Sequence, residues 1–183
     1  QSADHEAARE IVAKDKRIDA LELSLERLVL LIITSRAPMA EDLRYLIVAI
    51  RIGTMLERTG DQAKRIARRV KDIHPREIAR DITRIRAMAR YASEMVEHAI
   101  DSFNTSDETI AQQVIEDDAQ LNGMNANLVR ASSEAMGAGE QSVGHGVEII
   151  SIGKQLERVG DYATNIAQEV LYMVTGKREG DAR

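Results

Sequence analysis

The sequence contains no cysteine and no tryptophan, and its 183 residues include one phenylalanine and two prolines. Without cysteine there is neither a disulfide framework nor a thiolate metal site, which fits a reducing compartment. The shortage of aromatic residues disfavours β-sheet. The longest apolar run, Leu28 to Ile33, is far shorter than the roughly 18 residues of a membrane span. A net charge of −5 argues against general nucleic-acid binding.

The most informative feature that is present is an internal repeat. Residues 50–70 and 150–170 share a pattern of Ile, Gly, Leu-Glu-Arg, Gly-Asp and Ala at one constant offset, since 157 − 57 and 161 − 61 both give 100. Such self-similarity predicts a duplicated structural unit. Each copy carries a glutamate and an aspartate four residues apart, which places both on one face of a helix.

Apolar periodicity and helix breakers predict five long helices and an all-α fold. We expect the helices at about residues 5–35, 41–73, 76–103, 108–136 and 143–174. Pro38 and Pro75 end the first two, because proline lacks an amide donor and restricts the residue before it. Residues 104–107 and 137–139 form the later breaks, and residues 177–183 are expected to form a tail.

The duplication extends upstream of the repeated pattern. A shift of 103 places Asp15 on Asp118, so the first two helices match the last two and the third has no counterpart. We therefore expect tandem pseudo-symmetric three-helix bundles: residues 1–75 lack their N-terminal helix, and residues 76–176 form the second unit. An amphipathic helix is predicted upstream of Gln1. Without it, the first hairpin exposes an apolar face that can pair with another chain.

The hairpin geometry predicts further carboxylates opposite the repeated pair. Residues equidistant from the turn lie level in an antiparallel hairpin, so we expect Asp15 beside Asp61. By the same count Asp19 lies beside Glu57. Asp15 and Asp19 belong to one acidic stripe on the first helix, which comprises Asp15, Asp19, Glu22 and Glu26.

Carboxylates that face carboxylates repel one another unless a cation lies between them. An all-oxygen cluster without His or Cys suits magnesium, manganese, calcium or ferric iron better than zinc or copper. The identity of the metal stays open among iron, manganese, magnesium, calcium and zinc. We predict that the metal ligands are Asp15, Asp19, Glu22, Glu57, Asp61, Asp118, Glu157 and Asp161.

The second cluster is expected to bind metal more weakly than the first. In the second hairpin, the same count of residues from the turn places Asp118 beside Asp161. It places Asn122 beside Glu157, and Asn125 also stands where a carboxylate is expected. An amide offers a neutral oxygen in place of a charged one, which weakens the attraction for a cation.

Other interpretations remain open. The acid pairs can be solvated helix faces neutralised by Arg58 and Arg158, which would leave a structural helical adaptor without metal. A ferritin-like, carboxylate-bridged metal enzyme is disfavoured, because its Glu-x-x-His pairs do not occur here. A metal-dependent phosphatase is disfavoured because the four histidines lie off the acidic stripes. The mid-helix Gly60 and Gly160 each cost up to about 1 kcal/mol against alanine, which favours a packing or functional role.

The segments Leu56 to Asp61 and Leu156 to Asp161, with residues 36–44 before the first, resemble the PhoU family of accessory regulators of the phosphate-specific transport system. The resemblance covers nearly the whole chain. It implies two three-helix bundles and metal binding at the repeated acidic pairs, faced by Asp15, Asp19 and Asp118 on the preceding helices.

The same resemblance implies a cytoplasmic protein that is not an enzyme and represses phosphate-starvation signalling and phosphate uptake. The implied partners are the phosphate sensor histidine kinase and the ATPase of the phosphate ABC transporter, at the inner face of the membrane. We expect a homodimer that does not bind nucleic acid and is at most peripheral to the inner membrane.

Overall fold

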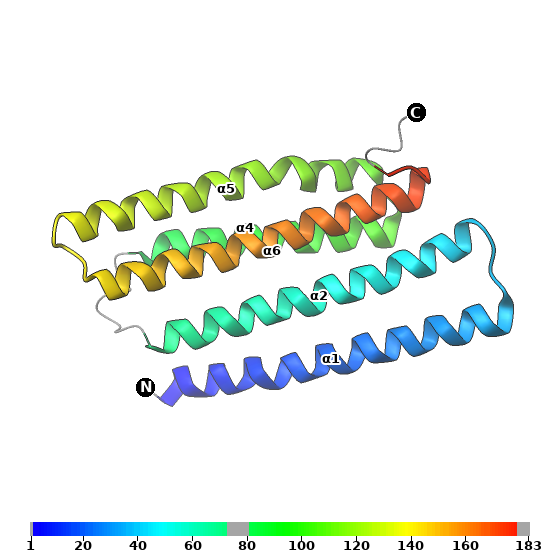
Figure 1. The fold of residues 1–183 in the computed structure, drawn as a ribbon, viewed down its shortest axis with the longest axis horizontal. Helices are drawn as coiled ribbons and strands as arrows, with labels where there is room; N and C mark the ends of the chain where they lie inside the picture. The colour runs from blue at the N-terminus through cyan, green and yellow to red at the C-terminus, as the bar shows by residue number, and fades with distance from the viewer. Residues whose placement is uncertain (1, 73–80, 179–183) are drawn as a thin grey trace.

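The computed structural model describes the backbone of residues 2–72 and 81–178, and the side chains of residues 16–70 and 81–178. These ranges form five helices and contain no strand, which confirms the predicted all-α fold. Figure 1 shows the helices running along the long axis, with α2 between α1 and the group formed by α4, α5 and α6. The helices are α1 (Ser2–Arg36), α2 (Glu41–Asp72), α4 (Ile82–Thr105), α5 (Glu108–Gly137) and α6 (Val143–Thr175).

The observed helix ends agree with the turn chemistry of the sequence. Asp107 caps α5, because its Oδ1 accepts hydrogen bonds from the amides of Thr109 and Ile110 at 2.8 and 3.2 Å. Gly176 adopts a left-handed conformation, with φ of 72°, that ends α6. The predicted break at Pro75 lies outside the described residues, and α4 begins at Ile82, after Asp81 at its N-cap, rather than at residue 76.

The hydrophobic core lies where α6 meets α2, α4 and α5. Its large side chains include Met88 and Met95 of α4 and Leu121 of α5, all at most 1% exposed. Val48 and Ile52 of α2 belong to the same cluster, so one continuous core joins the two predicted repeats. The domain division into residues 1–75 and 76–176 stays a prediction.

The two hairpins, α1 with α2 and α5 with α6, pack in the same register. A Cβ atom on Gly53 would lie 2.8 Å from Leu25, and one on Gly153 would lie 2.9 Å from Leu128. The leucines are 103 residues apart (128 − 25) and the glycines 100 (153 − 53), which are the offsets of the sequence repeat. Close approach of the helix axes therefore explains the mid-helix glycines, and they need no metal. A second matching pair follows the same offsets: a Cβ atom on Gly60 would contact Ile18, and one on Gly160 would contact Leu121.

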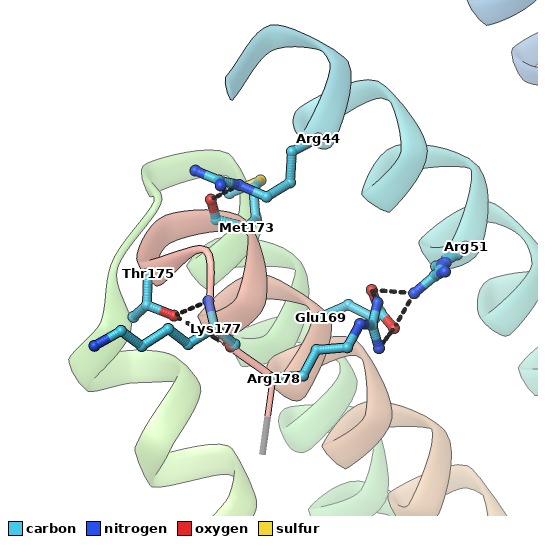
Figure 2. A network of polar contacts seen from close by, with 7 residues as sticks. All are labelled: Arg44, Arg51, Glu169, Met173, Thr175, Lys177 and Arg178. Atoms are coloured by element: carbon cyan, nitrogen blue, oxygen red, sulfur yellow. Dashed lines mark hydrogen bonds and ion pairs between the residues drawn. The ribbon is translucent and has the colours of Figure 1, made fainter. Parts of the chain in front are cut away.

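A polar network also joins α2 to α6 (Figure 2). The Arg51 guanidinium of α2 donates to Glu169 of α6, and Arg178, which follows α6, donates to the same carboxylate. Arg44 of α2 donates from Nε to the carbonyl oxygen of Met173 at 2.8 Å. These contacts satisfy a buried carboxylate and a carbonyl near the end of α6.

The first hairpin exposes apolar side chains, as predicted. Helix α1 packs against α2 at the edge of the molecule (Figure 1), and five of its leucines are 52–66% exposed. The helix predicted upstream of Gln1 stays a prediction. None of the described helices combines the length and apolar character that crossing a lipid bilayer requires. The exposed leucines are Leu21, Leu23, Leu28, Leu30 and Leu31.

Candidate metal centre

The predicted ligands of the first repeat lie on α1 and α2. Asp19 is exposed, whereas Glu22, Glu57 and Asp61 are half-buried. Asp15 lies on α1, but its side chain falls outside the described residues. Glu22 corresponds to Asn125 and Glu57 to Glu157, because 125 − 22 is 103 and 157 − 57 is 100, the two offsets of the repeat. Since the hairpins share one register, Glu22 lies opposite Glu57 as Asn125 lies opposite Glu157.

The predicted ligands of the second repeat lie close together, on α5 and α6. Burial raises the pKa of Asp161 above its usual value, and the negative charges of Asp118 and Glu157 raise it further. The positive charges of Lys154 and Arg158 act in the opposite direction. The structure therefore places the three carboxylates near enough for their charges to interact.

The contact opposite Glu157 differs from the expected one. The side-chain amide of Asn125 donates to Glu157 Oε2, whereas Asn122 donates to Asp118 Oδ2 at 2.7 Å on its own helix. Counting residues from the turn predicts Asn122 as the residue beside Glu157. The observed partner lies three residues further along α5, because counting from the turn gives the height along the helix and not which side chain faces α6: Asn125 is buried and Asn122 is exposed.

Both carboxylate oxygens of Glu157 are already engaged by the protein. Lys154 Nζ contacts Oε1 and Asn125 Nδ2 donates to Oε2. Among the described atoms, Asp118 Oδ1 is buried without a hydrogen-bond partner. A divalent ion at Glu157 would have to displace an ammonium or an amide group.

The first cluster has its lysine in another place. Lys64 Nζ lies 3.5 Å from Asp61 Oδ1, three residues after the aspartate. Position 54, which corresponds to Lys154, is a threonine whose hydroxyl donates to the Ile50 carbonyl oxygen at 3.3 Å. The second cluster thus has a lysine beside its glutamate, and the first has a lysine beside its aspartate.

The two clusters differ in how well their donors fit a metal ion. Within residues 16–70 and 81–178, no three acidic or histidine side chains converge closely enough to hold one. The second cluster fits poorly, since its glutamate is satisfied and amides replace two carboxylates. The first offers an all-oxygen set of hard ligands, of which Asp15 has no described side chain. Metal binding by the eight predicted ligands stays a prediction.

The structure contains a second cluster of polar side chains that the sequence did not predict. Asp81, 2% exposed, accepts a hydrogen bond from Gln141 Nε2 at 3.1 Å, and Ser132 Oγ donates to Gln141 Oε1 at 3.0 Å. His145 Nε2 lies 3.8 Å from Asp81 Oδ2. The network fastens the α5–α6 turn to the start of α4. Its members are far apart in the chain, so no local spacing could reveal it.

Lys154, the missed neighbour of Glu157, had a local signal. A lysine three residues before a glutamate lies on the same helix face, and position 54 lacks one. Comparing the repeats at this position would have identified the difference between the clusters.

Comparison with known proteins places these features in context. The family model for the PhoU domain matches residues 1–70 and 85–170. The phosphate-specific transport system accessory protein PhoU homolog of Zymomonas mobilis is 39% identical over 94% of this chain and 73% of its own length. The crystal structure of PhoU from Pseudomonas aeruginosa has a TM-score of 0.84 at 29% identity, covering 96% of this chain and 85% of that chain. The corresponding Streptococcus pneumoniae regulatory protein has a TM-score of 0.82 at 27% identity, with coverages of 97% and 84%.

Proposed function

Because the chain belongs to the PhoU family, we propose that it is a negative regulator of phosphate-starvation signalling and phosphate uptake. The names of its relatives, accessory proteins of the phosphate-specific transport system, support this assignment. The proposed partners are the phosphate sensor histidine kinase and the ATPase of the phosphate ABC transporter. The protein would act without catalysis, as a cytoplasmic homodimer that is at most peripheral to the inner membrane.

We also propose that the regulator binds metal through its acidic clusters. The observation that supports it most is the repeated Glu-x-x-x-Asp pair, carried by two hairpins that pack in one register. A hard divalent or ferric ion would neutralise the facing carboxylates of α1 and α2 and hold the two helices together. The second cluster, Asp118 with Glu157 and Asp161, would bind more weakly. The first cluster comprises Asp15, Asp19, Glu22, Glu57 and Asp61.

A pull-down with the phosphate sensor kinase, with the metal content of each preparation measured alongside, tests both the proposed partner and the proposed metal site. The chain is incubated with the kinase in EDTA or in manganese, in parallel with a variant in which Asp15, Glu57 and Asp61 are alanine. We expect capture by the unmodified chain, stronger in manganese, and no manganese effect in the variant. Absence of capture under both conditions would contradict the partner assignment. Equal metal content in both preparations would contradict the metal site.

A metal-free helical adaptor is the second candidate. It is favoured by the lysine contacts, Lys64 with Asp61 and Lys154 with Glu157, which offset carboxylate repulsion without a bound ion. Elemental analysis separates the candidates. Purified protein that carries no metal, and takes up none from a manganese solution, favours the adaptor.

A further inference from the structure

We propose that the ammonium group of Lys154 is the resident cation of the second cluster, so that this repeat holds its acid pair together without a metal ion. The inference rests on the proposed function, because it compares the second cluster with a first cluster that is proposed to bind metal. Lys154 and Asn125 are not among the metal ligands that the family resemblance implies.

The contacts of Glu157 give the first reason. Its side chain is 17% exposed, so its charge is largely removed from water and needs partners in the protein. Lys154 supplies a full positive charge at Oε1, and Asn125 supplies an amide donor at Oε2. These two groups occupy the oxygens that a metal ion would use.

The comparison of the repeats gives the second reason. Lys154 corresponds to Thr54, and Asn125 corresponds to Glu22. Both exchanges change charge in the same direction, by adding a positive group or removing a negative one. The first repeat has its own lysine, Lys64, beside Asp61. At position 154 the second repeat therefore has a positive charge where the first has a neutral side chain.

The charge of each cluster follows from these exchanges. The second cluster has three predicted carboxylate ligands where the first has five. Ligand charge is a main determinant of divalent-cation affinity at oxygen sites. A cation therefore gains less from the second cluster and must also displace Lys154.

A metal-free measurement tests the role of Lys154 directly. In EDTA, Lys154→Thr should lower the thermal midpoint of the full chain by about 1–4 °C, because the acid cluster loses its counter-ion. Gln168→Thr is the matched control, since it replaces another exposed side chain of α6 by threonine. Equal midpoints for the two variants would overturn the proposal.

A binding measurement tests the exchange with metal. Glu57→Ala with Asp61→Ala confines binding to the second cluster, and manganese is then titrated with free ion detected by paramagnetic resonance. Adding Lys154→Thr and Asn125→Glu should raise the affinity about tenfold or more. If the combined variant fails to fold, Lys154→Thr alone, which changes a 53% exposed side chain, carries the test.

The outcomes separate this proposal from the proposed function. No manganese binding by the unmodified chain, with a gain of binding in the exchanged second cluster, would reject metal binding by the first cluster and support the role of Lys154. Unchanged manganese affinity after the exchange would overturn the role of Lys154, whatever the first cluster binds. The reciprocal change, Thr54→Lys, should weaken manganese binding at the first cluster by a similar factor.

Discussion

The guanidinium group of Arg51 donates to both carboxylate oxygens of Glu169, at 2.9 and 3.1 Å, and so joins α2 of the first repeat to α6 of the second. Glu169 is only 8% exposed and also accepts two hydrogen bonds from Arg178. Two cations on one buried carboxylate compensate for its lost hydration. The relationship gives the two repeats a polar connection beside their shared apolar core.

Arg51→Ala should destabilise the protein by about 1 kcal/mol. The arginine side chain is 44% exposed, so solvent screening limits its contribution, and Arg178 still satisfies part of Glu169. Urea unfolding at low and high salt measures the loss, which should shrink with salt. Arg86→Ala, an exposed arginine of α4, is the control. Equal effects of the two substitutions would exclude a contribution from the contact with Glu169.

Gly160→Ala should destabilise the protein by about 1–3 kcal/mol, although alanine favours helix. Its Cβ would collide with the buried Leu121 side chain and meet Met95 at 3.7 Å. Gly123→Ala is the matched control, because a Cβ there meets nothing within 4 Å and should stabilise the helix by about 0.5–1 kcal/mol. Chemical denaturation of both variants checks the opposite signs. A stabilising Gly160→Ala would show that the helices can separate without cost.

Tyr91 should make stability depend on alkaline pH. Burial raises the pKa of Tyr91 above its ordinary value of 10.0, and the charge and hydrogen bond of Asp117 raise it further. The folded state therefore keeps the phenol proton where the unfolded state has lost it. This contribution is fully present below pH 10 and is lost as the pH rises through the folded pKa.

Tyr91→Phe should remove that slope and cost about 1 kcal/mol at neutral pH, through the lost hydrogen bond to Asp117. Unfolding free energies measured from pH 8 to 11 test both effects. Parallel stability curves for the two proteins would show that another group governs the alkaline transition.

Variants that keep one acidic cluster should differ in metal content. Glu157→Ala with Asp161→Ala retains the first cluster and should bind manganese nearly as well as the unmodified chain. Glu57→Ala with Asp61→Ala retains the second and should bind at least about tenfold more weakly. Elemental analysis after equilibrium dialysis measures both. Equal metal content in the two variants would refute the predicted difference between the clusters.

The helices were predictable because their signals are local. Apolar residues at helical spacing and breakers such as Pro38 identified four of the helices to within three residues at each end, and the end of α4 as well. The sequence repeat also predicted that the two hairpins share one geometry, and the matching glycine contacts confirm it.

The candidate clusters were only partly predictable. The spacing of Glu157 and Asp161 on one helix followed from helical periodicity, and the proximity of Asp118 followed from hairpin geometry. The partner of Glu157 did not, because counting from the turn gives only the height along the helix. Which of two nearby side chains faces the partner helix depends on the rotation of α5 about its axis.

The sequence by itself determined five helices, their duplication and the carboxylates that each hairpin can offer, because these depend on residue spacing along one chain. Only the tertiary structure decided that Asn125 and Lys154 occupy the oxygens of Glu157 and that Arg51 and Arg178 share Glu169. Such contacts depend on the distance and rotation between packed helices. Side-chain volumes across the whole core set these quantities, and no local pattern records them.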